Sequence, residues 1–169
     1  MKISIRKATP SDWPAIDSIF SNAREYMRTH GNPTQWGEHG PGNDKIKRDI
    51  DSGNFLVLTD EEGTIHACFA LIYGNDHTYF HINGAWKSDE PYATMHRAAT
   101  DGKLSGCLDA MFSYSSSLYP HLRADTHRNN HGVQEKLLKL GFEYCGIINV
   151  DDGTERLAYE WMRKEDASC

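Results

Sequence analysis

Histidine is the residue type of this chain with the widest chemical use, because its imidazole ligates metals and exchanges protons near neutral pH. The sequence holds nine histidines, and two pairs, His77 with His81 and His127 with His131, have the i, i+4 spacing of a helix face. Neither pair falls within a convincing helical pattern, and no HExxH motif accompanies them. No GxSxG elbow of a serine hydrolase is present either. We therefore expect neither a metal site nor a Ser-His-Asp hydrolase.

Aromatic side chains in two stretches without periodicity, residues 32–36 and 79–86, are the next candidates for chemistry. Such side chains line pockets for apolar or cationic groups, or they cover the hydrophobic core, and both interpretations stay open. The carboxylate of Asp125 has three open roles: to bind an ammonium group, to orient His127, or to make a turn hydrogen bond. The candidate substrate-binding residues are Trp36, Tyr79, Trp86, Tyr92 and Asp125.

The composition is that of one globular domain. The chain has 169 residues, of which 38% are apolar and 25% charged. No apolar run approaches the roughly 18 residues of a membrane span. Residues 1–6 resemble a strand more than a signal segment, so we expect a cytoplasmic protein. The net charge of −6 disfavours a nucleic-acid binder and mildly favours a cationic partner such as an amine.

The four cysteines form no CxxC pair and no disulfide framework is expected. Cys68, Cys107 and Cys145 are predicted to be small buried hydrophobic residues, and Cys169 a loose thiol at the tail.

Hydrophobic periodicity predicts an alternation of strands and helices along the whole chain. Ile3 and Ile5 indicate a first strand, and Thr9, Pro10 and Asp12 a capped helix start. The predicted elements are a helix to about residue 30, a helix over 44–51, a hairpin of strands 55–58 and 65–73, a strand over 92–100, a helix over 104–118, a strand over 122–126, a helix over 130–140 and a hairpin of strands 142–150 and 156–161. This order predicts a single α/β domain over 1–169, with one mixed sheet and helices on both faces.

Three segments in this order resemble the GNAT superfamily of N-acetyltransferases over nearly the whole chain. Residues 5–9, with Asp12 and the stripe of Trp13 and Ile16, are similar to its first strand and helix. Residues 95–106 are similar to its fourth strand and pyrophosphate loop, and Asn130 with Gly141-Phe142 to its fifth-strand-to-helix segment. The runs at 32–36 and 123–127 resemble a bacterial subgroup of uncharacterised members. The resemblance implies acetyl-CoA as co-substrate, with no metal.

The loop at 101–106 departs from the superfamily pattern in either alignment. If the pattern starts at Asp101, Leu104 stands at the position of the first glycine; if it starts at Lys103, Leu108 stands at the position of the last glycine or alanine. Backbone N–H groups at a helix N-terminus still suit a pyrophosphate. The alternative is a plain loop before a helix, and Asn130 is equally an N-cap. The residues that the resemblance assigns to the cofactor are Ala98, Ala99, Thr100, Lys103, Leu104, Ser105, Gly106, Cys107 and Asn130.

The resemblance also implies catalytic roles. His96, in the fourth strand, is the candidate base that takes a proton from the amine, or else a hydrogen-bonded core histidine. Strand alternation places it on the face opposite to Arg97. The tyrosine that often protonates the leaving thiolate is replaced by Leu137, so Tyr144 or Cys145 is the substitute, unless both are core residues.

The function expected from these residues is transfer of an acetyl group from acetyl-CoA to a primary amine of a small or amino-acid-like molecule. Two alternatives stay open: a non-catalytic acyl-CoA-binding domain, and an acetyltransferase that acts on protein or peptide amines. A homodimer paired through the final hairpin is a habit of the superfamily.

Overall fold

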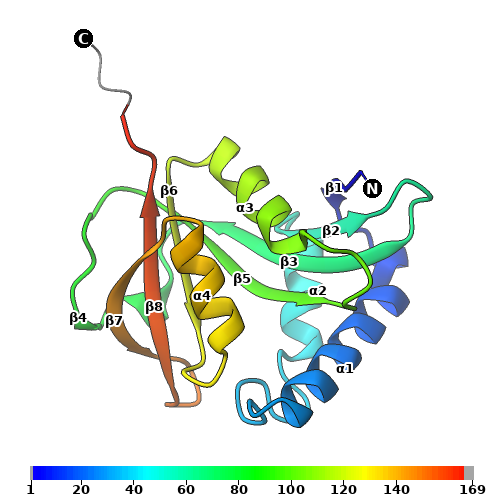
Figure 1. Cartoon of the computed structure of the whole chain (residues 1–169), viewed down its shortest axis with the longest axis horizontal. Coiled ribbons are helices and arrows are strands. Elements are labelled where there is room, and N and C mark those ends of the chain that lie inside the picture. The colour runs from blue at the N-terminus through cyan, green and yellow to red at the C-terminus, as the bar shows by residue number, and fades with distance from the viewer. Residues whose placement is uncertain (1, 166–169) are drawn as a thin grey trace. The chain divides into compact units, whose positions relative to one another are not determined.

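The computed structural model describes residues 2–165, and the chain divides into two compact units (Figure 1). The first unit comprises Met1–Ile72 with Met95–Met111, and the second Tyr73–Thr94 with Phe112–Cys169. The α-helices are α1 (Trp13–Thr29), α2 (Asn43–Asp51), α3 (Cys107–Leu118) and α4 (His131–Lys139), with 3-10 turns at Pro10–Asp12 and His77–Tyr79. The strands are β1 (Ser4–Lys7), β2 (Phe55–Thr59), β3 (Ile65–Tyr73), β4 (Asn83–Gly84), β5 (Ala93–Thr100), β6 (His121–Thr126), β7 (Glu143–Asn149) and β8 (Glu155–Met162).

The eight strands form one mixed sheet, which confirms the predicted fold class. Within the first unit the strand order is β1-β2-β3-β5, and within the second it is β6-β8-β7-β4. The predicted hairpins β2–β3 and β7–β8 are both antiparallel ladders. In the first unit α1 and α2 lie on one side of β2 and β3, and the beginning of α3 lies on the other (Figure 1). No helix among residues 2–165 is long and apolar enough to cross a membrane.

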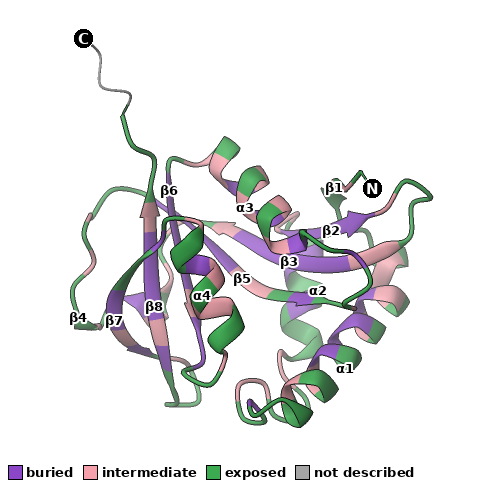
Figure 2. Ribbon diagram, viewed as in Figure 1, coloured by how far each residue is buried: buried purple, intermediate pink, exposed green. Residues whose placement is uncertain are grey.

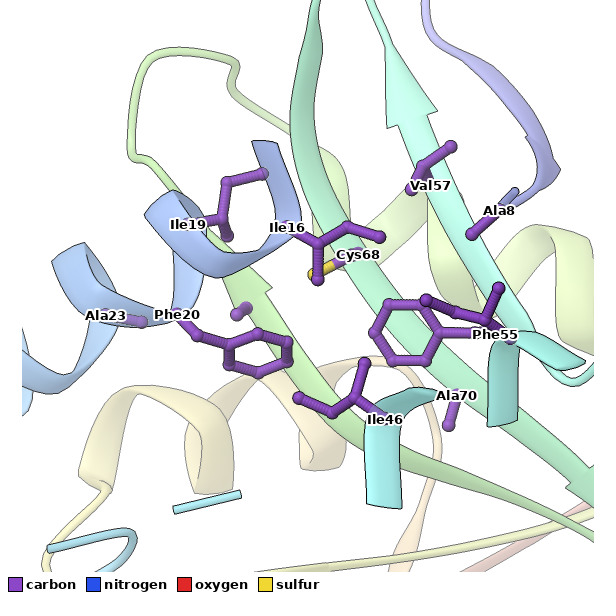
Figure 3. Close-up of a cluster of buried hydrophobic side chains, with 12 residues drawn as sticks. Ala8, Ile16, Ile19, Phe20, Ala23, Ile46, Phe55, Val57, Cys68 and Ala70 are labelled. Atoms are coloured by element: carbon purple, nitrogen blue, oxygen red, sulfur yellow. The ribbon is translucent and has the colours of Figure 1, made fainter. Parts of the chain in front are cut away.

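The core of the first unit follows from the helical spacing of apolar residues in α1. Ile16, Ile19, Phe20 and Ala23 are buried, and they recur at intervals of three and four residues, so they form one stripe. Figure 3 shows this stripe packed with Ile46 of α2 against Phe55 and Val57 of β2. β2 is buried at every position, as its uninterrupted apolar run predicts, and Figure 2 shows it buried along its length.

The 3-10 turn at Pro10–Asp12, which leads into α1, is held by the predicted capping residues. The backbone N–H of Thr9 donates to Asp12 at 2.8 Å, and Asp12 also receives two guanidinium bonds from Arg6, at 2.7 and 2.9 Å. The bidentate pair ties β1 to the first helical turn, so the sequence signal for a helix start is confirmed.

The second unit contains a strand that periodicity did not predict. β4 has only two residues, Asn83 and Gly84, and it pairs with Ile147 and Gly146 of β7. A Cβ at Gly84 would lie 2.1 Å from the carbonyl oxygen of Cys145, and one at Gly146 would lie 2.2 Å from that of Asn83. Both glycines also have positive φ, so this pairing needs glycine on both strands.

The cysteine prediction is confirmed for Cys68, Cys107 and Cys145, which are buried free thiols. Cys169 lies outside the described residues.

Candidate functional site

The centre of β5 has an irregular backbone at the residues expected to do chemistry. Arg97 has a φ of 52°, in the left-handed region, so the strict alternation predicted for His96 and Arg97 does not hold there. The Arg97 guanidinium lies 3.3 Å from the carboxylate of Asp49 in α2. Burial raises the pKa of Asp49, and the charges of Arg97 and His96 act in the opposite direction. His96 is half-buried and shares the electrostatic environment of this ion pair.

The C-terminal end of β5 presents alternate residues to solvent. Ala98 and Thr100 are exposed, and Ala99 between them is buried. The side chains that this end of the strand presents to solvent are therefore small.

A loop of residues 101–106 joins β5 to α3, and we name residues 96–107 the β5–α3 segment. Lys103, Ser105 and Gly106 are exposed, whereas Leu104 and Cys107 are buried. The Cys107 thiol donates to the carbonyl of Leu104 at 3.1 Å, so these two residues fix the loop to the core. Leu104, which stands at a glycine position of the superfamily pattern, therefore packs its side chain into the core and fixes the loop there.

Gly106 ends this loop, directly before the first residue of α3. Its φ of 79° is positive, its carbonyl accepts the first helical bond from Ala110 at 3.0 Å, and a Cβ there would meet nothing within 4 Å. The N–H groups of a first helical turn have no partner within their helix, and the helix dipole favours an anion near them. The exposed loop before α3 is thus suited to phosphate oxygens.

A surface hollow of about 530 Å³ lies in the first unit, beside α1 and the loop between α1 and α2. It is lined by Asp17, Arg24, His39, Gly42, Asn43 and Asp44. Two carboxylates thus face a guanidinium and an imidazole around a small-molecule-sized space. The α2 helix extends from this rim to Asp49, five residues or about 7.5 Å beyond Asp44.

The aromatic residues predicted to receive a cationic substrate form a cluster in the second unit, around a cation of the chain itself. The Arg123 guanidinium carbon lies 4.0 Å from the ring centroids of both Trp86 and Tyr92. Its Nη2 donates to the carbonyl of Ser88 at 2.7 Å. Arg123 therefore occupies the ring faces that a substrate cation would use.

Two other predicted substrate residues also have partners within the chain. The hydroxyl of Tyr79 donates to Asp125 at 2.6 Å, and the pKa of Tyr79 is raised well above its usual value by burial and by the Asp125 charge. Trp36, in the first unit, packs edge-on against Phe20 at a centroid distance of 5.4 Å. The substrate roles of all five residues stay predictions, and the contacts seen here are packing and hydrogen bonds.

Arg123 also belongs to a buried polar cluster around Glu160, which the sequence analysis did not predict. Glu160 is fully buried, and it accepts bonds from His121 Nε2 at 2.6 Å, Arg123 Nε at 3.3 Å and the backbone N–H of Lys87 at 2.6 Å. Burial opposes its ionisation, but the bonds from His121 and Lys87 and the charge of Arg123 outweigh it, so the pKa of Glu160 is lowered. The available signal was a glutamate between Tyr159 and Trp161 in an apolar strand.

The two candidates for proton donation differ in environment. Tyr144 is 50% exposed, so the alternative of a core tyrosine is wrong; its ring packs edge-on against Tyr159. Cys145 is buried, and burial together with the Glu160 charge raises its pKa to about 11. Leu137 is buried in α4. Asn130 caps α4, with its side chain accepting from the Val133 N–H at 3.3 Å, as the N-cap alternative predicts.

Solved structures share this architecture. An acetyltransferase of the GNAT family from Streptococcus agalactiae is 30% identical, with 96% of each chain covered and a TM-score of 0.85. A GNAT superfamily phosphinothricin acetyltransferase from Sinorhizobium meliloti, in complex with AcCoA, is 13% identical with a TM-score of 0.63, and the match covers 100% of this chain and 93% of the other. YncA from Salmonella typhimurium, a putative acetyltransferase with its cofactor acetyl-CoA, is 15% identical with a TM-score of 0.60 and coverage of 98% and 96%. No family model and no curated protein sequence matches the chain.

Proposed function

Because the chain belongs to the GNAT family of acetyltransferases, we propose that it transfers the acetyl group of acetyl-CoA to a primary amine of a small or amino-acid-like molecule. The observation that carries the cofactor part is the β5–α3 segment. It combines an exposed strand end at Ala98 and Thr100 with an exposed loop that leads into the N-terminus of α3. The complexes of two relatives with acetyl-CoA support the same co-substrate.

In this proposal the pantetheine arm lies along residues 98–100 and the pyrophosphate lies at Lys103 and the backbone of residues 104–107. The Lys103 ammonium supplies a charge of the right sign for phosphate. Leu104 and Cys107 take part through their backbone, because their side chains are buried. Asn130 belongs to the second unit, where its side chain caps α4, and its role toward the cofactor stays a prediction.

The amine is proposed to enter through the hollow beside α1. Asp17 and Asp44 supply negative charge for an ammonium group, and α2 connects this rim with Asp49, Arg97 and His96 within the same unit. The volume of about 530 Å³ suits a small molecule better than a protein surface. The acidic net charge of −6 agrees with a cationic acceptor.

The reaction begins when His96 accepts a proton from the ammonium form of the substrate. The neutral amine nitrogen attacks the thioester carbonyl, a C–N bond forms, and the C–S bond breaks. The nitrogen then loses its second proton, which the departing CoA thiolate takes up, so the products are the amide and CoA thiol. An alkyl amine with a pKa of about 10 is protonated at pH 7, so a base raises the reactive fraction. A thiol has a pKa of about 8.5, so the thiolate leaves with modest help, which is consistent with Leu137 in place of a tyrosine.

The test is calorimetric titration with acetyl-CoA and with free CoA, followed by turnover with polyamines, amino acids and short peptides. We expect micromolar acetyl-CoA binding, and turnover of a small amine over peptides. His96→Ala should lower kcat about a hundredfold or more with an unchanged acetyl-CoA Kd, because general-base catalysis supplies that much. His81→Gln, a change at an exposed histidine, is the matched control.

Each result separates the alternatives. Binding of acetyl-CoA without turnover of any amine identifies a non-catalytic acyl-CoA-binding domain, and preference for peptides identifies a protein acetyltransferase. An equal loss of affinity and turnover in His96→Ala makes His96 a structural residue. No binding of either ligand refutes the proposed use of acetyl-CoA.

A further inference from the structure

His66, near the start of β3, joins two acidic residues from different loops of the first unit. Its Nε2 lies 3.0 Å from Asp60 Oδ2 in the turn between β2 and β3. Its Nδ1 lies 2.9 Å from Asp101 Oδ2, at the first residue of the loop between β5 and α3. All three side chains are largely removed from solvent, with exposed fractions of 10–13%.

This geometry defines the charge on His66. An ionised carboxylate only accepts hydrogen bonds, so a ring nitrogen that bonds to one must carry a proton. Both ring nitrogens face carboxylate oxygens, and the ring is therefore an imidazolium. The charges that act on it come from Asp101 and Asp60, and their hydrogen bonds raise the pKa of His66 against a smaller opposing effect of burial.

Asp101 connects this cation to the β5–α3 segment. Its Oδ1 accepts the backbone N–H of Lys103 at 2.9 Å, and its own N–H donates to the carbonyl of His66 at 2.9 Å. Asp60 is bound in turn by the N–H groups of Glu62 and Thr64 at 3.1 and 2.8 Å. Each end of the bridge is thus attached to backbone, so the bridge restrains the loop at its first three residues.

The charge matters as much as the position. Asp101 is an anion at the beginning of a loop that, under the proposed function, receives the pyrophosphate of acetyl-CoA. Without a counter-ion its carboxylate would repel that ligand. The imidazolium of His66, which Asp101 shares with Asp60, offsets part of this charge. Its bond to Oδ2 also orients the carboxylate, whose Oδ1 holds the Lys103 N–H.

We propose that His66 is a positioning residue for acetyl-CoA, which acts through Asp101 to hold and neutralise the loop between β5 and α3. The inference rests on the proposed use of acetyl-CoA by this segment. It assigns His66 no contact with the substrate, so its loss should affect cofactor affinity far more than the chemical step.

The experiment compares the wild-type protein with His66→Gln, Asp101→Asn and the double variant, with His81→Gln as control. Acetyl-CoA Kd, KM and kcat are measured from pH 6 to pH 9.5, together with amide hydrogen exchange of residues 101–107. We expect His66→Gln to raise Kd and KM about tenfold at pH 6–7, with kcat nearly unchanged, because Asp101 loses its counter-ion. Exchange in the loop should become faster.

Two comparisons set this role apart from a merely structural one. The Kd ratio between His66→Gln and the wild type should shrink towards one as the pH rises through the raised pKa of His66, since the wild-type ring then loses its charge. Asp101→Asn should remove most of the effect of His66→Gln, because the amide carries no charge to neutralise. If His66→Gln binds acetyl-CoA like the wild type while the wild type binds it well, the proposal is wrong and the proposed function stands. If the wild type binds no acetyl-CoA, both are wrong.

Discussion

At the scale of single residues, the chain shows how a buried charge is satisfied by groups that are distant in sequence. Glu160 is bonded to a backbone N–H 73 residues away, at Lys87, and to His121, 39 residues away. Arg123 completes the cluster between the rings of Trp86 and Tyr92. The charge-assisted hydrogen bonds to Glu160 offset the desolvation cost of burying its carboxylate.

Removing the Glu160 carboxylate is therefore expected to destabilise the protein strongly. Glu160→Ala leaves the buried guanidinium of Arg123 and the ring of His121 without the carboxylate that they share, and such losses cost about 3–5 kcal/mol in free energy of unfolding. Urea denaturation at pH 7 measures the change, with Glu155→Gln, at an exposed position of the same strand, as control. A loss below about 1 kcal/mol would show that the cluster contributes little.

At the scale of elements, short contacts between strands matter as much as long ladders. β4 has two residues, yet its backbone lies so close to β7 that neither Gly84 nor Gly146 has room for a Cβ. In the first unit, α2 links the hollow at Asp44 to the Asp49–Arg97 ion pair beside His96. A helix of nine residues thus contributes to the proposed acceptor entrance through Asp44 and to the ion pair with Arg97, the neighbour of the proposed base, through Asp49.

The glycine contact gives a stability prediction. Gly84→Ala should lower the free energy of unfolding by about 2–4 kcal/mol, because the methyl group collides with the Cys145 carbonyl and φ is +134°. Gly132→Ala in α4 is the matched control, since its Cβ meets nothing within 4 Å and alanine favours a helix by up to about 1 kcal/mol. Thermal or urea unfolding of both variants decides the matter. Equal stability of the two would disprove the close approach.

At the scale of the whole molecule, stability depends on pH through carboxylates that the fold holds ionised. Hydrogen bonds from Arg6 lower the pKa of Asp12 from 3.8 to about 2, against the opposing effect of burial and with a smaller contribution from Thr9. The pKa of Asp60 is lowered mainly by His66. Depressed carboxyl pKa values stabilise the fold above the unfolded values and lose that effect as the pH falls through the folded ones.

Asp12→Asn tests this acid dependence. The variant should be about 1 kcal/mol less stable than the wild type at pH 7, because Arg6 is half-exposed and water screens the pair. The difference should shrink as the pH falls from about 4 to 2, and vanish only below the folded pKa of about 2, where Asp12 is protonated in both states. Urea unfolding at pH 7, 4, 3 and 2 provides the values, and the exposed Glu61→Gln should show no such convergence. A constant difference across this range would refute the assignment to Asp12.

The order of the main elements was determined by the sequence alone, because hydrophobic periodicity and capping residues are local. The stripe of Ile16, Ile19 and Phe20 predicted α1, and Thr9 with Asp12 predicted its start. The phosphate role of the loop before α3 was implied by the resemblance to the GNAT superfamily and not by periodicity, and it stays a proposal for this chain.

The tertiary structure decided which partner each polar or aromatic side chain has. In the sequence, Trp86 and Tyr92 are candidates to bind a substrate cation, but in the structure their rings contact the guanidinium of Arg123 from β6. Leu104 departs from the expected glycine pattern, and only the structure shows that its side chain is buried. The two-residue strand β4 is too short to show periodicity, so only its pairing with β7 identifies it. These outcomes depend on contacts between residues far apart in sequence, for which spacing along one segment carries no information.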